Sequence, residues 1–93
     1  MANYLINELN TYYSTHHIKI LKPSLDLYQS SIVTFKFKYI STDYIIEELL
    51  KYKVVVTNRN NFIRVSPHIY NTIGDINYFL KVLNLIINIK SNY

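Results

Sequence analysis

The chain has 93 residues, of which 49% are hydrophobic and 15% aromatic, with one Gly and two Pro. This length and composition predict one ordered domain over residues 1–93 and exclude the charge-rich, aromatic-poor class of disordered proteins. The formal net charge of +4 favours an anionic partner, but the basic residues are too evenly spread to indicate nucleic acid by themselves.

The first predicted element is a helix over residues 3–14. Apolar side chains recur there at helical spacing and would form one stripe, made of Leu5, Ile6, Leu9, Tyr12 and Tyr13. Residues 18–22 then predict a short strand or extended arm. Pro23-Ser24 predicts the start of a loop, because Pro ends such a segment.

Residues 31–39 carry the clearest strand pattern of the chain. Apolar and polar side chains alternate there, so Val33, Phe35, Phe37 and Tyr39 would face the core, with Thr34, Lys36 and Lys38 on the other side. Ser41-Thr42-Asp43 predicts a helix start, and residues 43–52 predict the helix that follows. Its apolar side would consist of Ile45, Ile46, Leu49 and Leu50.

The second half of the chain predicts a hairpin and a long helix. Lys53 to Thr57 and Phe62 to Ser66 would be strands on either side of a turn at residues 58–61. In the second strand, Ile63 and Val65 would point one way, and Phe62, Arg64 and Ser66 the other. A capping box of Thr72 and Asp75 predicts a helix from about residue 73 to 89, before a frayed end at residues 91–93. Its apolar face would consist of Ile76, Phe79, Leu80, Leu83, Ile86 and Ile87.

The order α-β-β-α-β-β-α predicts an α+β fold. We expect a two-layer sandwich in which helices pack on one face of a small, mainly antiparallel sheet of three or four strands. No secretion signal and no run of about 20 apolar residues is visible, so neither export nor a membrane span is expected. The absence of Cys excludes disulfides and thiolate chemistry and fits a cytoplasmic protein.

Four blocks in the last two thirds of the chain occur together, in order, in one known family. They are Ser30-Ser31-Ile32-Val33-Thr34-Phe35, Ile46-Glu47-Glu48-Leu49-Leu50, Arg64-Val65-Ser66-Pro67-His68-Ile69-Tyr70-Asn71-Thr72 and Asp75-Ile76. In sequence and spacing they resemble the C-terminal small domain of class V aminotransferases, which are pyridoxal-phosphate enzymes of fold type I. That family includes cysteine desulfurases, kynureninases and isopenicillin-N-epimerase-like proteins. The Ser66-Pro67-His68 form is most similar to the kynureninase-like and epimerase-like branches.

The resemblance implies a role for Arg64 and a weaker one for His68. The arginine that matches Arg64 binds the substrate α-carboxylate in the family, and a planar guanidinium suits that task because it can donate two parallel hydrogen bonds. His68, which directly follows Pro67 in the same signature, is the second candidate for substrate binding, and its alternative is a packing role in the turn. The alternative is that Arg64 pairs with an acid or a carbonyl and has no ligand.

The resemblance also implies that the catalytic half is missing. The cofactor lysine lies in a Ser/Thr-x-His-Lys stretch of the family's large domain, and no lysine here has that context. The Asp and the aromatic residue that hold the cofactor ring, and the Gly-rich phosphate loop, also belong to the large domain. We therefore predict no catalytic and no cofactor-binding residue. Pyridoxal phosphate is expected only if a partner chain supplies the large domain.

Three functions remain open on the sequence alone. The first is a catalytically inactive small-domain homologue that acts as a structural or interaction module, forming a homodimer because apolar, Tyr-rich surface is left uncovered. The second is the small subunit of a split pyridoxal-phosphate enzyme. The third is a weakly basic nucleic-acid-binding module with a patch of Lys36, Lys38, Lys53 and Arg59. No metal site is predicted, because His16-His17 lacks a third ligand at suitable spacing.

Overall fold

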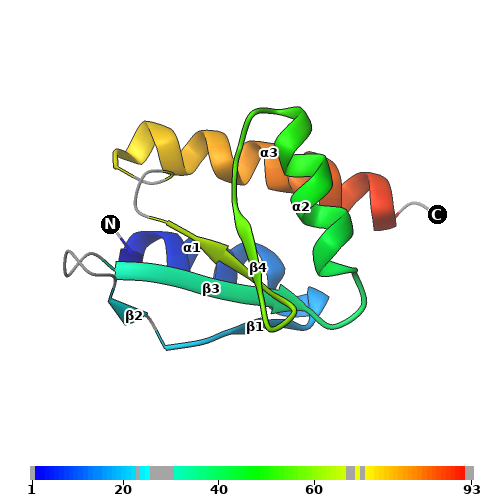
Figure 1. Cartoon of the computed structure of the whole chain (residues 1–93), viewed down its shortest axis with the longest axis horizontal. Helices are drawn as coiled ribbons and strands as arrows, with labels where there is room; N and C mark the ends of the chain where they lie inside the picture. Colours follow the sequence, from blue (N-terminus) through cyan, green and yellow to red (C-terminus); the bar gives the residue numbers. More distant parts are fainter. Residues whose placement is uncertain (1, 23, 26–30, 67–68, 70, 92–93) are drawn as a thin grey trace.

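The computed structural model describes residues 2–22, 24–25, 31–66, 69 and 71–91 (Figure 1). Its elements, in chain order, are α1 (Ala2–Tyr13), the 3-10 turn η1 (Ser14–His16), β1 (Ile18–Ile20), β2 (Ser24–Leu25), β3 (Ser31–Phe37), α2 (Thr42–Lys51), β4 (Thr57–Arg59), β5 (Phe62–Val65) and α3 (Ile73–Ser91). The predicted α+β sandwich and its element order are confirmed, with helices packed on one face of an antiparallel sheet. No helix in the described part of the chain is long and apolar enough to cross a membrane.

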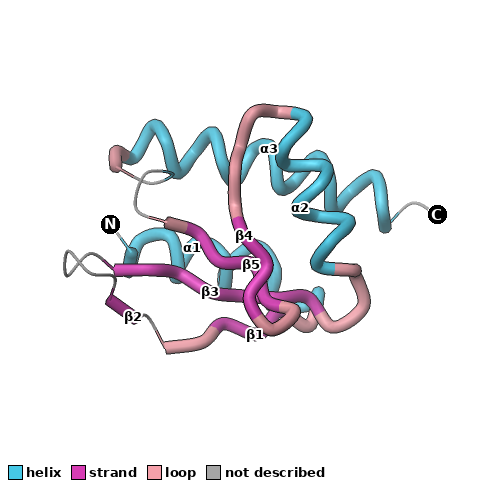
Figure 2. The backbone as a smooth tube through the Cα atoms, in the orientation of Figure 1, coloured by secondary structure: helices cyan, strands magenta, loops and turns pink. Residues whose placement is uncertain are grey.

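The sheet has the strand order β1-β3-β5-β4, with β3 and β5 in the middle (Figure 2). β2 also pairs with β3, where it continues the edge that β1 begins. Three residues separate Ile20 from Ser24 on this edge, but only two separate their partners, Phe35 and Ile32. The segment between these two pairs is therefore one residue longer on this edge than on β3. The predicted loop at Pro23-Ser24 is wrong for Ser24, which belongs to β2, while Pro23 lies outside the described residues.

The hairpin begins later than predicted. Residues 54–56 do not pair as a strand, and β4 starts at Thr57. The reason lies at the end of α2, where Lys53 has a φ of 63° and the Val54 N–H donates to the Leu49 carbonyl. The valines that follow are used for packing, since Val54 and Val56 are both buried in the core.

The hairpin turn is also shorter than predicted. Asn58 and Arg59 pair with β5, which leaves a two-residue turn of Asn60 and Asn61. Their φ values are 53° and 68°, and Asn tolerates this left-handed region better than most residues. The Asn61 N–H donates to Asn58 Oδ1 at 2.9 Å, which ties the turn to the end of the strand. The turn thereby fixes the register of the hairpin.

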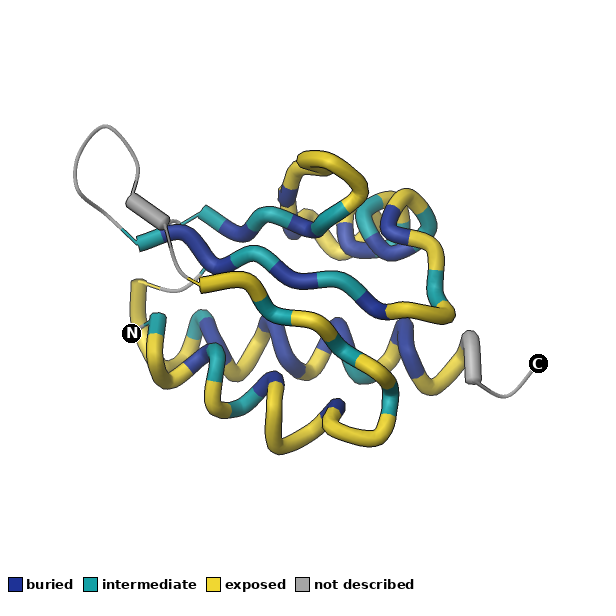
Figure 3. The backbone as a smooth tube through the Cα atoms, turned by 90° about the horizontal axis from the view of Figure 1, so that it is seen from below, coloured by how far each residue is buried: buried dark blue, intermediate teal, exposed yellow. Residues whose placement is uncertain are grey.

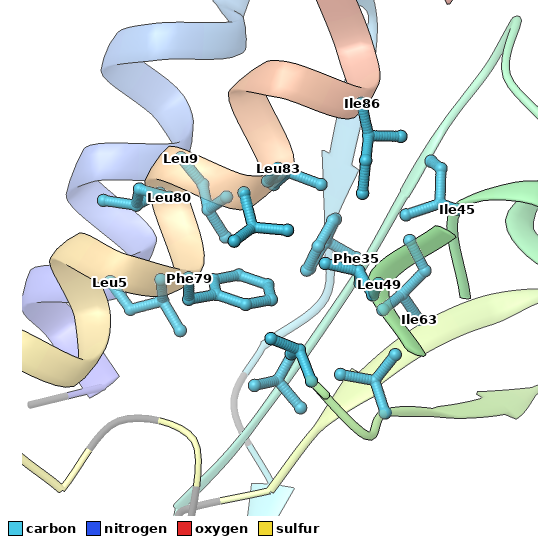
Figure 4. Close-up of a cluster of buried hydrophobic side chains, with 14 of the residues drawn as sticks. Leu5, Leu9, Phe35, Ile45, Leu49, Ile63, Phe79, Leu80, Leu83 and Ile86 are labelled. Carbon is cyan, nitrogen blue, oxygen red and sulfur yellow. The ribbon is translucent and has the colours of Figure 1, made fainter. Parts of the chain in front are cut away.

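The core is one cluster between the sheet and the helices. From Val33 to Phe37, buried and less buried positions alternate along β3 as the strand pattern predicts, and Ile32 before them is buried as well (Figure 3). The largest fully buried side chains are Phe35, Phe79, Leu5, Leu9, Ile45, Leu49, Ile63, Ile76, Leu83, Ile87, Val33 and Val65. All six residues predicted for the apolar face of the last helix are buried. Figure 4 shows side chains of all three helices meeting around Phe35 and Phe79.

Three residues predicted for the apolar faces are exposed. Tyr12 of the first helix is 52% exposed, because α1 turns Leu5, Leu9 and Tyr13 inward. Tyr39 is 67% exposed because β3 ends at Phe37 and the chain bends before it, so strand alternation no longer applies. Leu50 is 58% exposed because α2 turns the stripe of Thr42, Ile45 and Leu49 inward. Burying the Thr42 hydroxyl costs little free energy, because it donates a hydrogen bond to the Asn61 carbonyl at 2.7 Å.

The helix ends follow the predicted caps. The Ser41 hydroxyl accepts a hydrogen bond from the Tyr44 N–H at the start of α2. At the start of α3, the Thr72 N–H donates to the Asp75 carboxylate at 3.1 Å, and the Asp75 N–H donates to the Thr72 hydroxyl at 3.0 Å. This reciprocal pair confirms the capping box. Ser91 still belongs to α3, and residues 92–93 lie outside the described part.

One buried tyrosine makes the free energy of unfolding depend on pH in the alkaline range. Tyr13 is 2% exposed and its hydroxyl donates to Asn84 Oδ1; burial, and to a lesser degree Tyr12, raises the pKa of Tyr13 above its ordinary value. Because the folded pKa is the higher one, the stabilisation is complete below the unfolded pKa of about 10 and is lost as pH rises beyond it.

We expect the urea midpoint of the wild-type chain to fall when pH is raised past about 10, and to fall less in Tyr13→Phe. Tyr12→Phe is the matched control: Tyr12 is exposed and is only the smaller cause of the raised Tyr13 pKa, so this variant should keep most of the wild-type pH dependence. An unchanged slope in Tyr13→Phe would contradict the assignment.

Candidate functional site

The face of the sheet turned away from the helices is basic. Side chains alternate along each strand, so the residues that do not enter the core project from this outer face. The outer face consists of Lys19, Leu21, Thr34, Lys36, Lys38, Thr57, Arg59, Phe62 and Arg64. The described acidic residues lie on the three helices. The described outer face is therefore free of carboxylates.

Arg64 occupies the middle of this face. The register places it between Thr34 of β3 and Thr57 of β4. Its side chain is half-buried, and no acid in the described part of the chain pairs with it. The alternative expectation, that the Arg64 side chain pairs with an acid or a carbonyl, is not met by the described residues. A half-buried guanidinium without a partner is available to an anionic ligand.

A hollow of about 430 Å³ opens beside Arg64. Its walls are Leu21, Lys22, Thr34, Arg59, Asn60, Phe62 and Arg64. Three of these residues are cationic and none is acidic. The hollow brings together residues 21–22, β3 and the hairpin. These segments lie apart in the sequence, so spacing alone could not have grouped them.

Aromatic rings and lysines contact one another on the same face. The Lys36 ammonium lies 4.9 Å from the centre of the Phe62 ring, and the Lys38 ammonium lies 5.3 Å from that of Tyr39. Lys36, Lys38 and Arg59 therefore belong to one surface, as the predicted basic patch requires. Lys53 does not, because it follows α2 and borders a different hollow with Asp75 and Tyr78. Arg64, which strand alternation had placed on this side, completes the patch together with Lys19 and Lys22, which strand pairing and the hollow bring to it.

The second substrate-binding candidate, His68, lies outside the described residues, as does Pro67 before it. Ser66 is half-buried just beyond the end of β5. Of the two predicted site residues, the structure thus places only Arg64.

The two adjacent histidines have aromatic neighbours. The His16 ring packs edge-on against Tyr13 at 5.6 Å between centres, and the His17 ring against Tyr39 at 5.0 Å. His17 has a φ of 55° and ends η1. No group of three metal-ligating side chains occurs among the residues with described placement. The local contacts give both rings a packing role.

A second hollow, of about 570 Å³, lies between α1 and α3. Exposed Tyr4, Tyr12 and Leu85 border it, together with the polar groups of Glu8 and Lys81. Its charges are balanced and its rim is aromatic. This surface therefore differs in character from the cationic outer face.

The outer face does not fit pyridoxal phosphate by itself. The described residues there include no carboxylate to pair with a pyridinium nitrogen, and one side of the Phe62 ring is taken by Lys36. The described surface supplies cations and hydrogen-bond donors only. A cofactor of that type would need the groups of a second domain.

The chain matches no family model, no curated protein and no solved structure in the comparisons with known proteins. The resemblance to class V aminotransferases therefore stays a prediction that rests on the quoted residues.

Proposed function

We propose that the chain is a small-domain homologue of class V aminotransferases that acts as an interaction module, is catalytically inactive alone, and binds a ligand carboxylate through Arg64. The observation that supports this most is the position of Arg64, half-buried and without an acidic partner on the described outer face. The residues quoted for the family resemblance are consistent with the same role for this arginine.

The surroundings of Arg64 favour a carboxylate. Its position inside the sheet limits the number of conformations that its stem can adopt, so less entropy is lost when a ligand binds. The neighbouring Thr34 hydroxyl can donate a further hydrogen bond. Partial burial also weakens the screening of its charge by water.

Butyrate, titrated into ¹⁵N-labelled protein and followed by amide chemical shifts, tests the proposal. We expect shifts in β3 and β5, and Arg64→Ala should weaken binding roughly tenfold or more, since a hydrogen bond to a charged group contributes about 1.5–3 kcal/mol. The butyrate affinity of Arg64→Lys should lie between those of the wild type and Arg64→Ala, because lysine keeps the charge but lacks the planar guanidinium. Lys38→Ala, exposed on the same face, is the control. Equal affinity of wild type and Arg64→Ala would exclude Arg64 as the anchor.

We propose that the chain self-associates, with a dimer favoured. Large apolar and aromatic side chains are exposed on the helical layer, including Tyr4, Tyr12 and Leu85 around the α1–α3 hollow. Such a patch tends to recruit a protein partner. Light scattering should give about twice the chain mass of 11.1 kDa. A strict monomer at high concentration would refute self-association.

The lack of Cys favours the cytoplasm as the compartment.

A split enzyme is an extension of this proposal. A separately encoded large domain would supply the cofactor lysine, and the outer face would supply Arg64. Cofactor-dependent turnover that appears only when the two chains are mixed, and disappears with Arg64→Ala, would support it.

Binding of single-stranded nucleic acid is a second candidate function. Six cationic residues, Lys19, Lys22, Lys36, Lys38, Arg59 and Arg64, lie on or beside the outer face with an aromatic ring among them. Such a face can bind phosphates electrostatically and stack a base. The oligonucleotide titration described below tests it.

A further inference from the structure

Two arginines on neighbouring strands share the hollow of the outer face. Arg64 lies opposite Thr57, and Arg59 follows two residues further along β4. Residues in this diagonal relation have Cβ atoms about 7–8 Å apart, or slightly less, on the same face of the sheet. Both side chains line the hollow. Their guanidinium groups can therefore contact different ends of one small ligand.

The charges in the hollow are not balanced by the described residues. Lys22 joins the two arginines at its wall, and no described acid does. Neither arginine side chain has a hydrogen bond or ion pair to the described part of the chain. Three like charges around one small space repel one another. A ligand with two negative groups offsets this repulsion more fully than a single carboxylate.

The neutral groups of the hollow suit the middle of such a ligand. Phe62 lies opposite Arg59 and two residues before Arg64, so it is a neighbour of both arginines on the same face of the sheet. It offers apolar contact to a short carbon chain. The Thr34 hydroxyl and the Asn60 side chain add uncharged hydrogen-bonding groups at the wall.

We propose that this hollow binds a compact dianion, with one anionic group on Arg64 and the second on Arg59. This inference rests on the proposed function, because Arg64 is the anchor in both. The volume of about 430 Å³ lies within the range of sites for small molecules. The two chemical sources of such a ligand are a dicarboxylate and a phosphorylated carboxylate, whose phosphate adds part of a third charge at neutral pH. A guanidinium binds carboxylate and phosphate groups alike through two parallel hydrogen bonds.

Parallel titrations of the full chain with butyrate, succinate and phosphoglycolate, at equal ionic strength in phosphate-free buffer, test the proposal. We expect at least one dianion to bind roughly tenfold more tightly than butyrate, the gain expected from a second charge-assisted contact. Arg59→Ala should remove this gain, so that neither dianion binds this variant more tightly than butyrate does. Lys19→Ala, a cation of the outer face away from the hollow, should keep the wild-type preference. Which dianion binds more tightly identifies the second anionic group.

The outcomes separate this inference from the proposed function. If butyrate binding depends on Arg64 but both dianions bind no more tightly than butyrate, or if Arg59→Ala changes nothing, the dianion site is overturned and Arg64 keeps its role. If Arg64→Ala leaves butyrate binding intact, the proposed function fails and this inference with it. Binding of short single-stranded poly(dT) alone, weakening steeply with added salt, would overturn both in favour of a nucleic-acid module.

Discussion

Replacing Phe35 by alanine is expected to lower the free energy of unfolding by about 3–5 kcal/mol, the usual cost of removing a large buried ring. Phe35 is 0% exposed in the middle of β3. Its ring packs edge-on against Phe37 at 5.9 Å and close to Phe79 of α3 at 6.4 Å between centres. The cavity left behind would lie where the sheet meets the helices (Figure 4).

This loss is large relative to the whole stability of such a chain. A domain of this size is stabilised by roughly 5–14 kcal/mol, so the variant would lie close to its unfolding threshold. Urea denaturation followed by far-ultraviolet circular dichroism measures the change. Tyr39→Ala is the matched control, because Tyr39 continues the same sequence alternation but is 67% exposed. Its loss should stay below about 1 kcal/mol. Equal losses at the two positions would contradict the placement of the core.

The same two residues show how far the sequence predicts the fold. Alternation correctly predicted Val33, Phe35 and Phe37 as core residues, because every second side chain of a strand points to the same face of the sheet. It failed at Tyr39 because the pattern contains no information on where pairing stops. The prediction of a strand from Lys53 was wrong for a related reason. Lys53 has a left-handed backbone conformation that redirects the chain, and Val54 and Val56 pack in the core without pairing in the sheet.

The candidate site was predictable only in part. Strand alternation correctly placed Arg64 beside Phe62 and away from Ile63. It could not bring Arg59 and Lys22 to the same hollow, because that arrangement depends on pairing between segments far apart in sequence. The Asn60-Asn61 turn sets the register of Arg59 against β5, and pairing with β3 places the segment that carries Lys22 beside Thr34. Pairing between these segments thus decides which cations meet.

Deletion of residues 1–16 is expected to abolish cooperative unfolding. The blocks that resemble the family begin at Ser30, yet α1 contributes Leu5, Leu9 and Tyr13 to the central cluster, each 2% exposed or less. Burying side chains of this size contributes about 1.5–3 kcal/mol each, so the sum approaches the total stability of a domain this small. The remaining chain would expose the inner side of β3 and part of α3, which pack against α1.

Thermal and urea denaturation of residues 17–93 measure this effect. We expect no sigmoidal transition and increased binding of a hydrophobic dye, and a synthetic peptide of residues 1–16 added in trans should restore part of the transition. Leu9→Asp in the full chain should reproduce the loss, because it places a charge in the apolar cluster, while Asn10→Asp on the exposed side of α1 should not. If residues 17–93 unfold with the wild-type midpoint, α1 lies outside the folding unit. The outer face would then be supported by the family-like blocks alone. If the deletion unfolds the chain, Arg64 is held in place only because a helix outside those blocks completes the core behind its strand.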